Sequence, residues 1–250
     1  MPPRLLALLL VPLALVAAGC DEPAAPPTPA EAARADSVLT LLRTADRTDL
    51  ARAFERLEDY SYRVVTRTEQ LGPAGDVVAA TEDEVAVGPE GRRVLRRDTR
   101  GDYDFGAFTR FAGDGEDEAP ANPALLILPE EPAYLSPRAR ETFRFAFGPD
   151  TMLGGQPVET LLVRAAPDQD GQQLRAATLW LDAETGDLVG VRLLQVESSF
   201  LFGERSRMTV LLRPGPGGAW LPDRVAAETA LRAPLTEERR LRLVRSYGLE

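Results

Sequence analysis

The chain has 250 residues, a formal net charge of −10 and no histidine, and all 29 basic residues are arginine. An acidic chain repels the phosphate backbone of nucleic acids, so we expect no nucleic-acid partner. The absence of histidine excludes Ser-His-Asp and Cys-His catalysis and histidine-based zinc sites, and the absence of lysine excludes a P-loop. Carboxylate chemistry or a calcium site is left, and the sequence has no convincing acidic pair and no calcium-loop spacing. We therefore expect a protein that is not an enzyme and that uses no metal.

The first twenty residues have the layout of an export signal. Arg4 supplies a positive charge, residues 5–16 form an almost unbroken apolar run, and small residues at 17–19 precede Cys20, the single cysteine. This arrangement is typical of a secretory signal peptide, and the apolar run is shorter than the roughly 20 residues that span a bilayer. We predict that residues 1–19 are a signal peptide.

The end of this signal, Ala17, Ala18, Gly19 and Cys20, resembles the lipobox of bacterial lipoproteins. The resemblance implies cleavage between Gly19 and Cys20, a diacylglycerol on the Cys20 thiol and an acyl chain on the freed amine. A lone cysteine in an exported chain cannot form an internal disulfide, and two or three acyl chains anchor a protein stably. The alternative is a plain secretory signal followed by an incidental thiol.

We expect Cys20 to hold the protein on a membrane of the bacterial cell envelope, with the outer membrane or the periplasmic face favoured. Asp21 and Glu22 are compatible with more than one sorting route, so inner and outer membrane both stay open. Apart from the covalent lipids on Cys20, we expect no cofactor. Residues 20–30 are rich in proline and alanine, which predicts an extended tether between the lipid and a folded domain at 31–250.

Residues 31–57 predict an amphipathic helix that is interrupted near 46–49. From Tyr60 the apolar period changes to two, which indicates strands. Turn signals rich in glycine and aspartate then recur, and they separate long segments with strand character. These segments are 172–182, 187–198, 205–213, 219–232 and 237–247. Long strands joined by short turns favour a strongly curved antiparallel sheet, so we predict an α+β, mostly β, fold.

Residues at about 101–150 break this rhythm and form an insert, which holds an acidic loop, an apolar run and six of the nine phenylalanines. Within it, Phe143, Phe145 and Phe147 alternate, which places their rings on one face of a strand. Two interpretations are open. The three rings either fill an ordinary core, or they line a cavity that an open half-barrel requires.

Two acidic clusters could suggest a metal site. The segment 182–187, Asp-Ala-Glu-Thr-Gly-Asp, is instead typical of a hairpin turn, because Gly186 and the flanking alternation complete the turn signature. The run at 114–118 lacks the spacing of a calcium loop, and charge runs are usually solvated. We expect neither cluster to bind a metal.

The amphipathic helix, the long-stranded meander, the apolar insert and the segment LWLDAETGDLVGVRLL (179–194) together resemble the LolA/LolB-like superfamily of bacterial lipoprotein carriers. The resemblance implies an open half-barrel with a helical or loop insert on its concave side and an apolar cavity for acyl chains. The lipobox favours the membrane-anchored acceptor of that family. The candidate ligand-binding residues are then Phe143, Phe145, Phe147 and Trp180.

The sequence is therefore compatible with two functions. The first is non-catalytic binding of a hydrophobic ligand, an acyl chain or a lipoprotein, by a monomeric and membrane-anchored protein. The alternative is an interaction or assembly module of the cell envelope that uses the same scaffold with a filled core.

Overall fold

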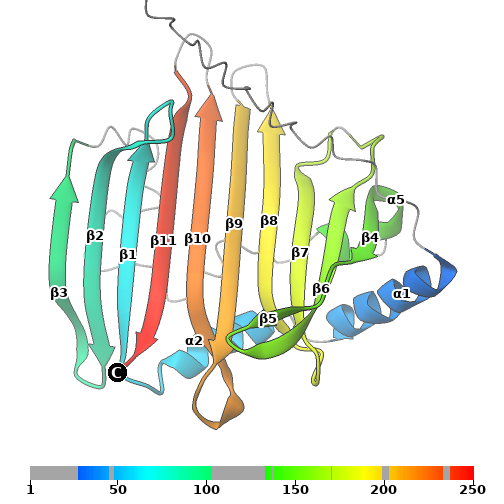
Figure 1. The fold of residues 1–250 in the computed structure, drawn as a ribbon, viewed down its shortest axis with the longest axis horizontal. Helices are drawn as coiled ribbons and strands as arrows, with labels where there is room; N and C mark the ends of the chain where they lie inside the picture. Colours follow the sequence, from blue (N-terminus) through cyan, green and yellow to red (C-terminus); the bar gives the residue numbers. More distant parts are fainter. Residues whose placement is uncertain are drawn as a thin grey trace, which may run out of the picture.

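The computed structural model describes residues 28–44, 48–102, 133–136, 138–169, 171–198, 203–232 and 237–250. Within these residues eleven strands form one antiparallel sheet (Figure 1). The strands are β1 (Tyr62–Leu71), β2 (Val77–Gly88), β3 (Gly91–Arg100), β4 (Phe143–Phe147), β5 (Thr151–Leu153), β6 (Gln156–Ala165), β7 (Leu174–Asp182), β8 (Leu188–Ser198), β9 (Gly203–Pro214), β10 (Trp220–Arg232) and β11 (Arg239–Leu249). Their order is β3-β2-β1-β11-β10-β9-β8-β7-β6-β4, and β5 pairs with β6.

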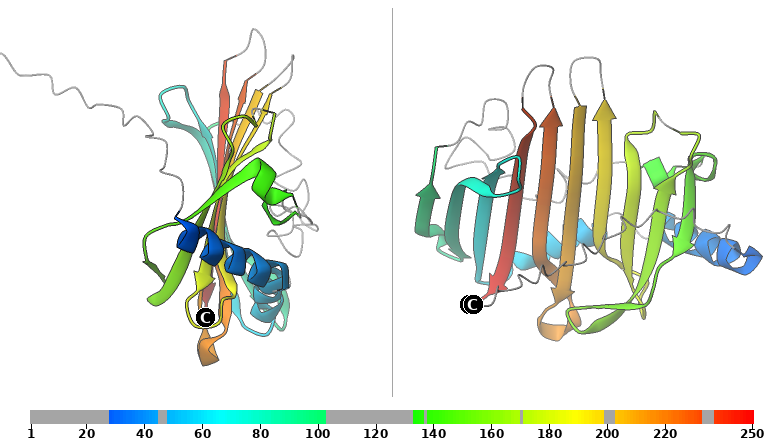
Figure 2. Two further views of the ribbon diagram at one scale, coloured as in Figure 1. Left: turned by 90° about the vertical axis from the view of Figure 1, so that its right-hand side faces the viewer. Right: turned by 45° about the horizontal axis from the view of Figure 1, so that its top comes forward.

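The sheet is open, because β3 and β4 lie at its two ends and do not pair with each other. Strands β7 to β11 are neighbours in chain order, and each begins and ends within a few residues of the segment predicted from the sequence. Strand β11 then pairs with β1, so the first and last strands of the chain lie side by side. Figure 2 shows the sheet edge-on as a twisted, curved surface. The predicted mostly β, open antiparallel fold is confirmed.

Two helices precede the sheet in the chain. Helix α1 spans Pro29–Thr44 and α2 spans Thr48–Leu57, so the predicted range of 31–57 is helical on both sides of residues 45–47, which lie outside the described part. A capping box fixes the start of α1. The Glu31 carboxylate accepts hydrogen bonds from the backbone nitrogen and the hydroxyl of Thr28, both at 2.7 Å, and the Thr28 hydroxyl accepts one from the Glu31 backbone nitrogen at 3.3 Å. These bonds satisfy donors that the first helical turn leaves free.

The face of the sheet that packs against α2 is the inner face. A row of cross-strand neighbours runs along it from β6 to β10, and each of its side chains is at most 1% exposed. The row consists of Leu161, Leu179, Val191, Val210 and Val225. Helix α2 adds Leu50, Ala53, Phe54 and Leu57 to the same core. The rings of Phe54 and Tyr247 meet edge to face at 5.6 Å, which places α2 over β11 as well.

The predicted insert contributes to the sheet itself. After residues 103–132, which lie outside the described part, the chain forms a short 3-10 turn η1 (Ala133–Leu135), helix α5 (Ala139–Thr142) and the end strand β4. Tyr134 and Ala139 are buried in the core. Among the described residues, no helix has the length and apolar character needed to cross a membrane.

Candidate functional site

The three alternating phenylalanines lie on the inner face, at the β4 end of the sheet. Phe145 is the cross-strand neighbour of Val163, and Phe147 is the neighbour of Leu161, a member of the buried row. Because paired residues of neighbouring strands share a face, the predicted common face of the three rings is confirmed. Their burial differs. Phe143 is 1% exposed, whereas Phe145 and Phe147 are only partly buried where they pack against the core.

Helix α1 lies next to this aromatic stripe. The guanidinium of Arg34 stands 4.6 Å from the ring centre of Phe147 and forms an ion pair with Glu159 of β6. A second ion pair joins Asp36 of α1 to Arg140 of α5. All four charged side chains of these pairs are well exposed to solvent, and exposed ion pairs contribute about 0–1 kcal/mol each. The polar contacts that hold α1 over Phe147 are therefore individually weak.

Trp180 lies on the opposite face of the sheet, which we call the outer face. It pairs with Thr160 and Gly190, one residue out of step with the buried inner row. A Cβ atom on Gly190 would lie 2.9 Å from Cε3 of Trp180, and the Arg192 guanidinium lies 5.3 Å from the Trp180 ring centre. By this register the sheet lies between Trp180 and the three phenylalanines, so the structure does not bring the four predicted residues together on one face.

The acidic segment 182–187 forms the turn between β7 and β8, as its sequence predicts. Asp182 Oδ1 accepts hydrogen bonds from the backbone nitrogens of Glu184 (2.8 Å) and Thr185 (2.9 Å), and Gly186 has a φ of 78°. Asp182 Oδ2 accepts a third hydrogen bond from the Trp220 side chain. Burial raises the pKa of Asp182, but these hydrogen bonds outweigh burial and bring it below its usual value. Both oxygens of this carboxylate therefore accept hydrogen bonds within the protein.

Within the described ranges, no group of three or more histidine, cysteine, aspartate or glutamate side chains is placed to hold a metal ion. The acidic run at 114–118 lies outside the described residues, as do residues 20–27 of the tether predicted at 20–30, Cys20 included. The last two residues of that tether, Pro29 and Ala30, belong to α1.

A pocket of about 460 Å³ opens on the outer face across β8, β9, β10 and β11. Apolar, arginine and glutamate side chains line it. The lining residues are Leu194, Val196, Glu197, Ser198, Gly203, Glu204, Arg205, Arg207, Glu228, Ala230, Arg232, Glu238 and Arg240. The sequence pattern did not predict this pocket. Arginine occurs at alternate positions, as at 205 and 207 or at 240 and 242, which places the charges on one face of each strand. This alternation is the sequence pattern that could have indicated the pocket.

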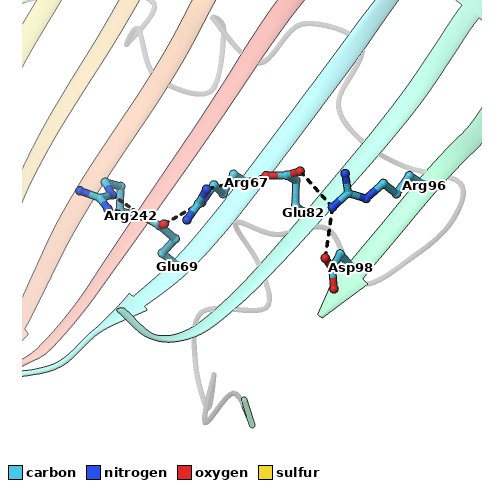
Figure 3. A network of polar contacts seen from close by, with 6 residues as sticks. All are labelled: Arg67, Glu69, Glu82, Arg96, Asp98 and Arg242. Carbon is cyan, nitrogen blue, oxygen red and sulfur yellow. Dashed lines mark hydrogen bonds and ion pairs between the residues drawn. The ribbon is translucent and has the colours of Figure 1, made fainter. Parts of the chain in front are cut away.

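A ladder of charged side chains covers the outer face of the neighbouring strands β11, β1, β2 and β3 (Figure 3). Glu69 is its centre, with a side chain only 4% exposed. It accepts hydrogen bonds from the Nε atoms of Arg67 at 2.7 Å and Arg242 at 2.5 Å. The ladder continues from Arg67 to Glu82, from Glu82 to Arg96, and from Arg96 to Asp98 at 3.2 Å. Its arginines are therefore paired with carboxylates.

No protein-family model matches the chain, and no curated protein matches its sequence. Among solved structures, the chain is similar to a putative outer membrane lipoprotein-sorting protein domain from Vibrio parahaemolyticus, with 12% identity over 81% of this chain and 91% of that chain and a TM-score of 0.23. A LolA superfamily protein from Nitrosomonas europaea has 10% identity over 82% of this chain and 93% of its own, with a TM-score of 0.22. The chain is also similar to a chain of the Pseudomonas aeruginosa MucA/MucB complex, with 12% identity over 81% of this chain and 98% of that chain and a TM-score of 0.22. These values are too low to assign a function.

Proposed function

We propose that the protein is a membrane-anchored, non-catalytic binding protein of the bacterial cell envelope, and that it holds a hydrophobic, acyl-bearing ligand against the inner face of its open sheet. The observation that carries this proposal is the uneven burial of the aromatic stripe. Phe143 is sealed in the core, while Phe145 and Phe147, on the same strand and the same face, keep accessible ring surface.

Accessible aromatic surface next to a sealed core favours a ligand contact. A phenylalanine that only fills a core gains most by complete burial, at about 25 cal/mol for each Å² of apolar surface removed from water. Leu161 and Val163, the cross-strand neighbours of Phe147 and Phe145, reach 0% exposure. An apolar ligand lying between β4 and α1 would complete the burial of the two rings. Because the polar contacts of α1 near this position are exposed and weak, admitting such a ligand would cost little.

The location in the envelope is supported by the start of the chain. The signal-peptide layout of residues 1–19 supports export, and Cys20 directly after Ala17-Ala18-Gly19 supports a lipid anchor. The proline-rich segment that follows would hold the folded domain away from the membrane surface, with about 3 Å for each residue in polyproline geometry. The anchored domain could then reach a ligand in the adjacent bilayer or in the periplasm.

Phe145→Ala and Phe143→Ala form a matched pair that tests the proposal. Both variants are made in the mature chain, residues 20–250, with Cys20→Ser so that no detergent is needed. Phe143→Ala should lower the free energy of unfolding by about 3–5 kcal/mol, as expected for a packed core. Phe145→Ala should cost clearly less and should weaken the binding of a fluorescent fatty-acyl probe. Urea unfolding and probe titration on the same samples give both quantities.

The alternative function, an interaction or assembly module with a filled core, is favoured by the complete burial of the row from Leu161 to Val225. It predicts that the protein with both phenylalanines intact ignores the acyl probe and that Phe145→Ala carries the full penalty of a core residue. Those two results together would overturn the binding proposal. Detection of co-purified lipid by mass spectrometry would instead contradict the filled-core alternative.

A further inference from the structure

The arginines of the outer-face pocket differ from those of the neighbouring ladder in how they are paired. On β1, β3 and β11 the arginines at 63, 67, 96 and 242 each form an ion pair with a carboxylate. Arg205, Arg207 and Arg232 line the pocket without an ion pair to any described residue. Arg207 is the cross-strand neighbour of Glu228, yet the two side chains do not form an ion pair. Among the described residues, no carboxylate forms an ion pair with these three guanidinium groups, which can therefore bind an anion.

Two of the four acidic side chains of the pocket have other partners. Glu238 is paired with Arg240 at 2.5 Å, and the Glu204 carboxylate accepts a hydrogen bond from the Ser206 hydroxyl at 2.5 Å. Glu197 and Glu204 are cross-strand neighbours at the end of β8 and β9. By alternation along the strands they belong to the inner face, whereas Arg205 and Arg207 belong to the outer face. Glu228 remains on the outer face beside Arg207, so the site would take one anionic group and would disfavour a highly charged polyanion.

Apolar side chains form the floor beneath the guanidinium groups. Leu194 and Val196 of β8 pair with Arg207 and Arg205 of β9, and Ala230 of β10 pairs with Arg205 on the other side. Leucine and valine next to two arginines on a solvent-facing surface offer an apolar contact directly below a cationic rim. A volume of about 460 Å³ lies within the usual range of roughly 300–1,000 Å³ for small-molecule pockets.

We propose that this outer-face pocket binds an amphiphilic oxyanion, in which a phosphate or carboxylate head contacts Arg205, Arg207 and Arg232 and a short apolar group rests on Leu194 and Val196. The planar guanidinium fork binds such oxygens by paired hydrogen bonds. The site is independent of the acyl ligand proposed for the inner face, because the sheet lies between the two. A soluble phosphate ester and the headgroup region of a phospholipid share this chemistry.

Calorimetric titration of the mature Cys20→Ser chain with n-hexyl phosphate, inorganic phosphate and n-hexanol tests the proposal. Hexyl phosphate should bind saturably, and the other two probes should bind at least about tenfold more weakly, because each lacks one half of the recognised structure. Arg207→Gln should weaken hexyl phosphate binding about fivefold, and Arg205→Gln should do the same. Arg224→Gln is the matched control, since Arg224 is an exposed outer-face residue of β10 that does not line the pocket.

Unchanged urea midpoints would show that the arginine variants are folded, so a loss of binding reports on the site. Absence of saturable hexyl phosphate binding would overturn the proposal, and so would equal losses in Arg207→Gln and Arg224→Gln. If inorganic phosphate binds as tightly as hexyl phosphate, the apolar floor takes no part. If Phe145→Ala weakens hexyl phosphate binding while Arg207→Gln does not, the probe occupies the inner face and this site is wrong.

The source of the anion is decided by a second arm. Sedimentation with phosphatidylcholine vesicles that do or do not contain phosphatidylglycerol measures binding to a headgroup in a bilayer. Binding that requires phosphatidylglycerol and is lost in Arg207→Gln but not in Arg224→Gln assigns the pocket to a lipid headgroup. Hexyl phosphate binding without such vesicle binding assigns it to a soluble amphiphile.

Discussion

The indole nitrogen of Trp220 donates a hydrogen bond of 2.9 Å to Oδ2 of Asp182, which lies 38 residues earlier in the chain. The other carboxylate oxygen of Asp182 accepts two backbone hydrogen bonds within the β7–β8 turn. One side chain therefore closes a hairpin turn and joins it to the first residue of β10. Trp220 is largely buried, so its N–H group would be left without a partner if the carboxylate were removed.

Removing this connection should destabilise the domain in two unequal steps. Trp220→Phe keeps much of the aromatic packing and loses one hydrogen bond, so we expect a loss of about 1–2 kcal/mol in the free energy of unfolding. Asp182→Ala loses three hydrogen bonds and leaves the indole N–H group without an acceptor, so we expect a loss of about 2–4 kcal/mol in the free energy of unfolding. Glu184→Ala, an exposed substitution in the same turn, should stay within about 0.5 kcal/mol. Urea unfolding would contradict the assignment if all three variants behaved alike.

The lowered pKa of Asp182 predicts a pH dependence. The pKa of this carboxyl lies lower in the folded than in the unfolded state, so its contribution to stability is complete above the unfolded value of about 3.9 and disappears as the pH falls through the folded value. Asp182→Asn should therefore be less stable than the wild type at neutral pH, and this difference should shrink as the pH falls below about 4. A difference that stays constant from pH 6 to pH 3 would contradict the prediction.

Glu69 should be the most sensitive member of the outer-face ladder. Its side chain is 4% exposed between Arg67 and Arg242, whereas Glu82 in the same ladder is 34% exposed. Glu69→Gln removes the charge that two arginines contact, and we expect a loss of about 1–3 kcal/mol. Glu82→Gln is the control and should cost less than about 1 kcal/mol. Equal losses measured by urea unfolding would show that burial does not govern this network.

Gly190 should not tolerate a side chain. A Cβ atom there would lie 2.9 Å from Trp180 and 3.2 Å from Leu211, so Gly190→Ala has to displace a buried indole. We expect a loss of about 1–3 kcal/mol, typical of overpacking. Gly248→Ala is the control, because Gly248 is also in a strand and its Cβ would meet no atom within 4 Å. A Gly190→Ala variant as stable as Gly248→Ala would contradict the tight packing of Trp180 on the outer face.

Cys20→Ser should abolish lipidation and leave either the uncleaved precursor or a differently processed form. The reason is chemical, since only the thiol accepts the diacylglycerol. Mass spectrometry of the protein and its partition between membrane and soluble fractions give the result. A Cys20→Ser protein of normal mature mass that still fractionates with membranes into detergent would show that another feature anchors the chain.

Several features of the fold could be predicted because they are local. The strand segments from residue 172 onward and the turn at 182–187 depend on periodicity and on turn residues, and the structure confirms them. The common face of Phe143, Phe145 and Phe147 follows from alternation within one strand. Trp180 could not be placed in this way. Its neighbours Leu179 and Leu181 are apolar too, so the pattern of β7 does not distinguish its two faces.

By itself, the sequence determined the strand and helix segments, because each depends on neighbouring residues. The export signal and the lipid anchor at Cys20 are predictions from the same kind of local pattern. Only the tertiary structure decided which residues from distant segments meet. Arg67 and Arg242 enclose Glu69 because β1 pairs with β11, and Arg205 shares a pocket with Arg232 and Arg240 because β9, β10 and β11 are in register. Register is set by the packing of the whole inner face, and a shift of one residue would move every side chain of a strand to the other face.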